Sequence, residues 1–217
     1  MENGFNSEIV VPPSLCGVDL SGGGMSGSTG IKRSLIRDLS GLFADEAAFE
    51  RLAGERGEEV AYAVHEFRPP RVVPQELVFG TSTVQPGKVG SEFFMTRGHI
   101  HIRTDRPEVY FCQRGRGVLH METPAGQTHP VAMEPGGVVY VAPYWVHRSV
   151  NVGEDPLITF FCYPADAGQN YEIIERARGM RTLIVDSGAG GWVEAENARY
   201  RPRTAEEARR YRTGSEA

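Results

Sequence analysis

Cysteine is scarce in this chain: only three of its 217 residues are cysteines. Cys16, Cys112 and Cys162 form no C-x-x-C pair and are odd in number, which argues against a disulfide framework. Cys112 and Cys162 lie in apolar, strand-like runs without an adjacent base or cation that would favour a thiolate. We therefore expect both side chains to be small buried hydrophobic groups and not nucleophiles.

The sequence also lacks a long apolar run and an excess of positive charge. No run is long enough to cross a bilayer, and the first five residues lack the basic start of a secretory signal. The net charge is −5, and acidic and basic residues are interspersed, which leaves no basic stripe for a nucleic-acid backbone. We therefore expect a cytoplasmic protein that binds neither membranes nor nucleic acid.

The two ends of the chain differ from its middle in composition and in the spacing of apolar residues. A glycine-rich stretch over 21–30 predicts a loop or a loosely held arm. Apolar residues spaced three and four apart between 31 and 54 predict one or two short helices, the second over about 45–53. Thr204 and Glu207 fit a capping box, so we expect a short charged helix near the end of the chain.

Short β-branched and aromatic runs, separated by glycine and proline, dominate from about residue 55. They predict strands over 60–67, 76–84, 109–112, 117–122, 138–141 and 157–163. Regularly spaced strands of this kind are typical of an all-β antiparallel sandwich or barrel. The chain is long enough for one domain, which we divide into an N-terminal arm with helices (1–54), a barrel (55–187) and a C-terminal extension (188–217).

The most informative motif is the His-x-His pair of His99 and His101, followed by Glu108 and then by His147. Side chains at i and i+2 of an extended strand point to the same face, so His99 and His101 can reach one ion. Three imidazoles and one carboxylate suit iron, manganese, nickel or zinc better than calcium or magnesium. We therefore predict one catalytic metal site, and we expect the remaining histidines to be structural: His65, His120 and His129.

The surroundings of these residues resemble the two cupin motifs. The first motif consists of the His-x-His pair, Glu108 and Gly115; the second consists of Gly137, Pro143, His147 and Asn151. His101 and Glu108 are further apart than in the usual pattern, and Trp145 stands where a glycine is common. Both departures are similar to those of the cupin-type phosphoglucose isomerases.

Further blocks within residues 80–175 are similar to the same family: 86–101, 133–136, 140–148 and 163–171. Two positions differ from its pattern. Arg97 stands where lysine is expected, which keeps the charge. Gln169 stands where several members carry histidine, which removes a titratable group from the rim of the pocket and with it a role in proton shuttling.

The resemblance implies a cupin barrel, that is, a double-stranded β-helix or jelly roll, with short flanking N- and C-terminal helices. It implies an isomerase that interconverts glucose 6-phosphate and fructose 6-phosphate through a cis-enediol. The resemblance implies one divalent metal per subunit, with iron(II) as the preferred ion and manganese, nickel or zinc as alternatives. Its four implied ligands are His99, His101, Glu108 and His147. It also implies a homodimer, associated through sheet edges and the N-terminal arm.

Residue roles follow from the same resemblance. Glu108 is the expected proton-transfer group, with Tyr163 as its substitute. The phosphate side is expected to consist of Ser82, Thr96, Gly98 and Tyr163. Tyr110 and Tyr171 are expected to line the pocket, and Lys88 and Arg97 to add positive potential.

Two other functions are compatible with three histidines and one glutamate. A metal-dependent cupin oxygenase or decarboxylase would use the same ligands for dioxygen chemistry. A non-catalytic module that binds a sugar phosphate would carry the metal as a structural ion. Oxygen consumption identifies the first alternative, and tight binding without isomerisation identifies the second.

Overall fold

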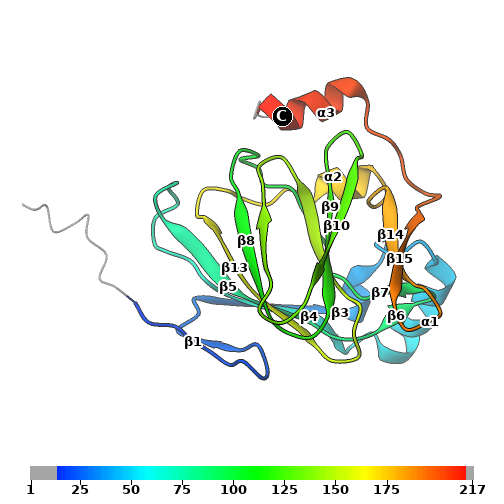
Figure 1. Cartoon of the computed structure of the whole chain (residues 1–217), viewed down its shortest axis with the longest axis horizontal. Coiled ribbons are helices and arrows are strands. Elements are labelled where there is room, and N and C mark those ends of the chain that lie inside the picture. Colours follow the sequence, from blue (N-terminus) through cyan, green and yellow to red (C-terminus); the bar gives the residue numbers. More distant parts are fainter. Residues whose placement is uncertain (1–13, 214–217) are drawn as a thin grey trace, which may run out of the picture.

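The computed structural model describes residues 14–213. Antiparallel sheets dominate it (Figure 1), and three of them build its body: a six-stranded sheet in the order β11-β8-β13-β5-β4-β3, a three-stranded sheet β10-β9-β12 and a four-stranded sheet β15-β14-β7-β6. The strands of the large sheet are β3 (Gly30–Leu35), β4 (Val60–Phe67), β5 (Leu77–Val84), β8 (Glu108–Arg114), β11 (Val138–Val141) and β13 (Leu157–Pro164). The others are β6 (Lys88–Val89), β7 (Glu92–Phe93), β9 (Gly117–Glu122), β10 (Thr128–Met133), β12 (Val146–Asn151), β14 (Thr182–Asp186) and β15 (Trp192–Glu196).

From β8 to β13 the chain crosses repeatedly between two sheets and stays in one sheet only from β9 to β10, which gives it a jelly-roll path. Strands β8, β11 and β13 belong to the large sheet, whereas β9, β10 and β12 form the three-stranded one. The predicted all-β cupin fold is therefore confirmed. All six strands predicted from the sequence are present, with ends that differ by a few residues at most.

Burial along β8 shows how the sequence directs side chains into the barrel. Glu108, Tyr110 and Cys112 are buried, whereas the intervening Val109 and Phe111 are exposed. This is the alternation of a strand with one face on the core and one face outward. Glu108 and Tyr110 consequently point to the interior. The expected burial of Cys112 is confirmed, whereas Cys162 on β13 is only half-buried.

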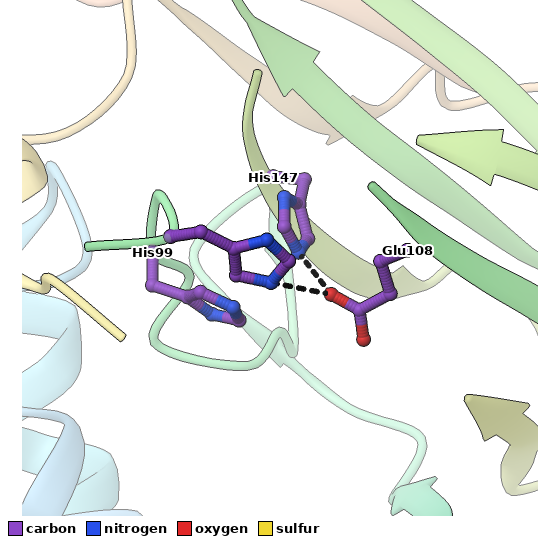
Figure 2. A group of neighbouring side chains, drawn as sticks. His99, Glu108 and His147 are labelled. Atoms are coloured by element: carbon purple, nitrogen blue, oxygen red, sulfur yellow. Dashed lines mark hydrogen bonds and ion pairs between the residues drawn. The ribbon is translucent and has the colours of Figure 1, made fainter. Parts of the chain in front are cut away.

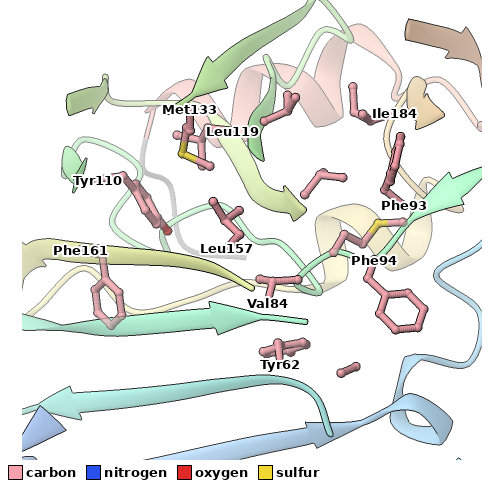
Figure 3. Close-up of a cluster of buried hydrophobic side chains, with 14 of the residues drawn as sticks. Tyr62, Val84, Phe93, Phe94, Tyr110, Leu119, Met133, Leu157, Phe161 and Ile184 are labelled. Carbon is pink, nitrogen blue, oxygen red and sulfur yellow. The ribbon is translucent and has the colours of Figure 1, made fainter. Parts of the chain in front are cut away.

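The core fills the space between the sheets. Figure 3 shows Leu119 of β9, Leu157 of β13 and Val84 of β5 in this cluster, and the first two are fully buried. Strand β9 is buried on both faces, because β14 covers the face that points away from the barrel; His120 Nε2 lies 3.0 Å from Thr182 Oγ1 there. His120 is thus a buried structural residue, as expected.

The first of the two predicted helices is wrong. Residues 30–35 form β3, which pairs antiparallel with β4, and only a single 3-10 turn follows (Ile36–Leu39). The apolar spacing that suggested a helix arises because Ile36 and Leu39 are buried by this turn. Pairing with β4, which is distant in sequence, decides the conformation of residues 30–35 and overrides the local pattern.

The other predicted helices are confirmed. Helix α1 (Glu46–Arg56) begins after Asp45, whose side chain accepts a hydrogen bond from the Ala48 amide. Helix α3 (Ala205–Thr213) begins with the expected capping box: the Thr204 amide donates to Glu207 Oε2 at 2.7 Å, and the Glu207 amide donates to Thr204 Oγ1 at 3.2 Å. A further short helix, α2 (Glu172–Arg176), was not predicted.

Two short strands and the chain ends complete the description. Strands β1 (Gly17–Val18) and β2 (Met25–Ser26) form a hairpin at the lower left of Figure 1, and α3 lies at the top. The division at residues 54 and 187 stays a prediction; β3 and β15 each pair with a strand from between those limits. No helix within residues 14–213 is long and apolar enough to span a membrane.

Candidate metal centre

The four predicted ligands come from three separate stretches of the chain. Glu108 is the first residue of β8 in the large sheet, and His147 lies on β12 in the three-stranded sheet. His99 belongs to an extended segment that pairs with β12 at one point: the His99 amide donates to the His147 carbonyl at 3.1 Å, and the His147 amide donates to the His99 carbonyl at 2.9 Å. This segment is not part of a longer strand, but its backbone holds His99 beside His147.

The structure brings all four predicted ligands together. One possible ligand atom from each of His99, His101, Glu108 and His147 lies within 4.8 Å of the others. Glu108 Oε2 is 3.2 Å from His101 Nε2 and 2.9 Å from His147 Nε2. Figure 2 shows His99, His147 and Glu108 converging, with dashed lines from the carboxylate to two imidazole nitrogens. All four side chains are buried.

The hydrogen bonds behind the histidines fix their protonation. His101 Nδ1 lies 2.8 Å from the Arg106 carbonyl, and His147 Nδ1 lies 3.1 Å from the Trp145 carbonyl. A carbonyl oxygen can only accept, so each Nδ1 carries the hydrogen and each neutral ring presents a lone pair on Nε2. Backbone carbonyls that orient metal-binding histidines in this way are common in metalloproteins.

These contacts fit a bound divalent metal better than an empty cluster. Both Nε2 atoms face the same carboxylate oxygen, so two hydrogen bonds to Glu108 would require both buried rings to be positively charged. A cation between them would instead bind the two neutral lone pairs and the carboxylate. His99 Nε2 is buried without a hydrogen-bond partner, and a metal would satisfy it as well. Three nitrogen donors and one oxygen donor suit a transition metal.

The protonation tendencies of His99 and Glu108 agree with this donor set, whereas for His101 burial lowers the pKa but the contacts with the Glu108 carboxylate outweigh it and raise it. Burial, followed by the nearby charge of His147, lowers the pKa of His99 well below its usual range, which keeps this ring neutral. Burial alone would raise the pKa of Glu108, but the hydrogen bonds with His101 and His147 outweigh it and lower that pKa strongly. The carboxylate is therefore ionised and the His99 imidazole is available as a ligand at neutral pH.

A cavity of about 270 Å³ opens beside the cluster. His99 and Glu108 line it, whereas His101 and His147 do not. All predicted substrate-binding residues line the same cavity: Ser82, Thr96, Gly98, Tyr110, Tyr163 and Tyr171. Their convergence from β5, β8, β13 and the loops around His99 could not be derived from strand patterns alone.

Several of these residues have the contacts of a polar binding site. Ser82 Oγ is buried without a hydrogen-bond partner, so it is available to a ligand in the cavity. Thr96 Oγ1 accepts a hydrogen bond from the Ser149 amide at 3.1 Å, which fixes the hydroxyl at the cavity wall. Gly98 has a φ of +77°, and a Cβ there would lie 2.8 Å from Arg148 Cβ, so this turn requires glycine.

The predicted role of Lys88 is wrong. Lys88 does not line the cavity, and its ammonium group pairs with Asp186. The reason is that Lys88 belongs to the β6–β7 hairpin, which joins the four-stranded sheet. Arg97 does line the cavity, and it pairs with Glu175 at 3.1 Å. Gln169 is at the cavity as expected and accepts a hydrogen bond from the Tyr171 hydroxyl.

Three charged residues of the cavity were not found from the sequence: Lys32, Glu66 and Arg68. Arg68 Nε lies 2.6 Å from Glu66 Oε1, and Arg68 Nη2 donates to the Tyr163 hydroxyl at 3.3 Å. Lys32 Nζ lies 5.4 Å from the centre of the Tyr171 ring. No local signal indicated Lys32, because its position on a strand follows only from the pairing of β3 with β4.

Comparisons with known proteins point to one family. The family model described as glucose-6-phosphate isomerase (GPI) matches residues 32–201. A protein of Sinorhizobium medicae (strain WSM419) named glucose-6-phosphate isomerase is 50% identical over 193 residues, which covers 89% of this chain and 90% of the relative. The glucose-6-phosphate isomerase of Thermococcus gammatolerans (strain DSM 15229 / JCM 11827 / EJ3) is 42% identical over 171 residues, covering 79% of this chain and 88% of the relative.

Among solved structures, one of oxalate oxidase with the substrate analogue glycolate aligns with a TM-score of 0.40 and 14% identity, over 51% of this chain and 55% of that one. The sequence relatives extend over most of both chains, and the family model spans the cluster and the cavity. This chain belongs to the glucose-6-phosphate isomerase (GPI) family.

Proposed function

We propose that this chain is a metal-dependent isomerase that interconverts glucose 6-phosphate and fructose 6-phosphate. The observation that carries the proposal is the buried group of three histidines and one glutamate at the wall of a cavity whose hydroxyls suit a sugar phosphate. The names of the relatives supply the reaction. We expect one divalent transition metal per subunit, with iron(II) first.

The residues that would hold the metal are His99, His101, Glu108 and His147. When bound there, the metal supplies a Lewis acid that stabilises negative charge on the substrate oxygens. Burial of the four ligands excludes water from one side of the site. His99 and Glu108 also line the cavity, so a metal held by the cluster would be accessible to a substrate bound there.

Glu108 is the proton-transfer group of this proposal. Isomerisation through a cis-enediol removes a proton from C2 of the aldose and returns one to C1 of the ketose. Both histidine contacts of Glu108 use Oε2, so we assign Oε1 as the oxygen that accepts the substrate proton and returns it. Tyr163 is less suited to act as a base, because burial raises its pKa well above the usual range and keeps the hydroxyl protonated. It is suited to donate a hydrogen bond to the substrate.

A coupled assay for conversion of fructose 6-phosphate to glucose 6-phosphate tests this function. We expect activity to disappear after chelator treatment and to return on addition of iron(II), manganese(II), nickel(II) or zinc(II). Oxygen uptake without isomerisation would favour the oxygenase alternative. Binding of the sugar phosphate that persists without metal and without turnover would favour a binding module.

Thr96→Ala tests the phosphate side of the cavity. We expect KM for fructose 6-phosphate to rise by about tenfold, the size of one lost hydrogen bond to a charged group, while kcat falls by less. Thr96→Ser retains the hydroxyl and is the matched control, with a KM near that of the unmodified protein. Loss of kcat with unchanged KM in Thr96→Ala would show that Thr96 is not a phosphate ligand.

The homodimer implied by the family resemblance stays a proposal. Strand β11 is at one edge of the large sheet, and Val138 and Tyr140 on this strand are exposed. Apolar side chains on an edge strand favour pairing with another chain.

A further inference from the structure

Three cationic side chains line the cavity: Lys32, Arg68 and Arg97. They differ in whether a carboxylate forms an ion pair with them. Arg68 Nε lies 2.6 Å from Glu66 Oε1, and Arg97 Nη1 lies 3.1 Å from Glu175 Oε1. Among residues 14–213, no carboxylate is within ion-pair distance of Lys32. Of the cavity cations, Lys32 is therefore the one without an acidic partner among the described residues 14–213.

Lys32 is close enough to the histidine cluster to reach the same ligand. Its Nζ lies 5.4 Å from the centre of the Tyr171 ring, and the centre of that ring lies 5.9 Å from the centre of the His99 ring. All three residues line the cavity. Tyr171 therefore separates Lys32 from the predicted metal ligands, and a substrate bound to the metal would extend past this ring.

A sugar phosphate brings close to two negative charges into the cavity at neutral pH. The hydroxyls of Ser82 and Thr96 and the backbone at Gly98 can donate hydrogen bonds to it, but they carry no charge. Arg68 forms an ion pair with Glu66, and Arg97 forms one with Glu175. The negative partners offset much of the positive potential that these two arginines would contribute to the cavity.

We propose that Lys32 is a substrate-binding residue that pairs with the phosphate group of the substrate, an inference that rests on the proposed isomerase function. A lysine suits this role because its ammonium group is a compact charge on a flexible stem. It can swing from the Tyr171 ring to the phosphate when substrate enters. The same charge at the mouth of the cavity attracts anionic substrates from solution.

Lys32→Gln tests this role, and the chain offers a matched control. Lys32 is an exposed side chain on a strand, so the replacement should leave the thermal midpoint unchanged. We expect KM for fructose 6-phosphate to rise about tenfold with kcat within a factor of about two, and Lys32→Arg to restore most of the affinity. Lys88→Gln removes a lysine that pairs with Asp186 away from the cavity and should leave KM unchanged.

Two additional readouts separate charge pairing from a merely structural role. KM of the unmodified protein should rise with added potassium chloride more steeply than KM of Lys32→Gln, because salt screens the pair that the variant lacks. Inorganic phosphate, measured by calorimetry, should bind the variant about tenfold more weakly. Equal KM values in Lys32→Gln and the unmodified protein, or loss of kcat alone, would overturn the assignment of Lys32.

The phosphate measurement also keeps the two proposals distinguishable. If the unmodified protein does not isomerise sugar phosphates, the proposed function fails, but weaker phosphate binding by Lys32→Gln would still support the anion-binding role. Equal phosphate affinities, or no phosphate binding by either protein, would overturn that role even if the isomerase reaction is observed.

Discussion

Replacing His147 by alanine is expected to remove the bound metal and the isomerase activity together. His147 Nε2 lies 2.9 Å from Glu108 Oε2, and its Nδ1 is fixed by the Trp145 carbonyl, so alanine at this position removes one of the four clustered ligands. Loss of residues that merely orient metal ligands lowers metal affinity or activity by about 10- to 100-fold, and loss of a ligand itself should exceed this range. Metal content per chain, measured by atomic emission, and the coupled assay give the two results.

The matched control is His129→Ala. His129 is exposed on β10 and is not one of the four clustered residues, so its loss should change neither metal content nor turnover. Circular dichroism would show that both variants retain the β fold. Normal turnover by a His147→Ala protein that has lost its metal would remove the metal from the mechanism.

Gly98→Ala is expected to destabilise the fold and to lower the metal content of the protein, because a Cβ at this position meets both a strained backbone and close neighbours. The left-handed backbone at Gly98 costs about 1–2 kcal/mol for any other residue. The new Cβ would also lie 2.8 Å from Arg148 Cβ and 2.8 Å from Ile174 Cδ1. Overpacking of this kind adds about 1–3 kcal/mol, so we expect a loss of about 2–5 kcal/mol in the free energy of unfolding, measured by urea denaturation.

Gly136→Ala separates the two causes. Gly136 also has a positive φ, of +89°, but a Cβ there would meet no heavy atom within 4 Å. It should therefore show only the backbone cost, about 1–2 kcal/mol, and normal metal content. In Gly98→Ala the segment must move away from β12, which displaces His99 and lowers metal content. Equal losses of stability in the two variants would show that the contacts of Gly98 with Arg148 and Ile174 do not matter.

The strands and the histidine cluster were predictable because both have local signatures. Alternating burial along β8 follows from its sequence, and the four clustered residues belong to motifs with characteristic spacing. Strand β3 has no such signature, because its conformation depends on pairing with β4 some thirty positions later. Lys32 was missed for the same reason, since a helix was expected where β3 lies.

Lys32 lines the cavity but was not predicted to do so, whereas Lys88 was predicted to contribute to the cavity and does not line it. Lys88 lies within a block of sequence that is similar to the family and includes His99, so proximity along the chain suggested proximity in space. The β6–β7 hairpin reverses the chain between them and directs Lys88 to Asp186.

The paired backbone hydrogen bonds between His99 and His147 have a consequence for how the protein acquires its metal. These bonds join two segments 48 residues apart without any contribution from a metal, so the folded chain already holds the two imidazoles in place. Demetallation should then empty the site without unfolding the barrel, and different ions can enter the same preformed geometry. Supply of each ion in the cell, together with the general order of transition-metal affinities, would then decide which metal the folded enzyme carries.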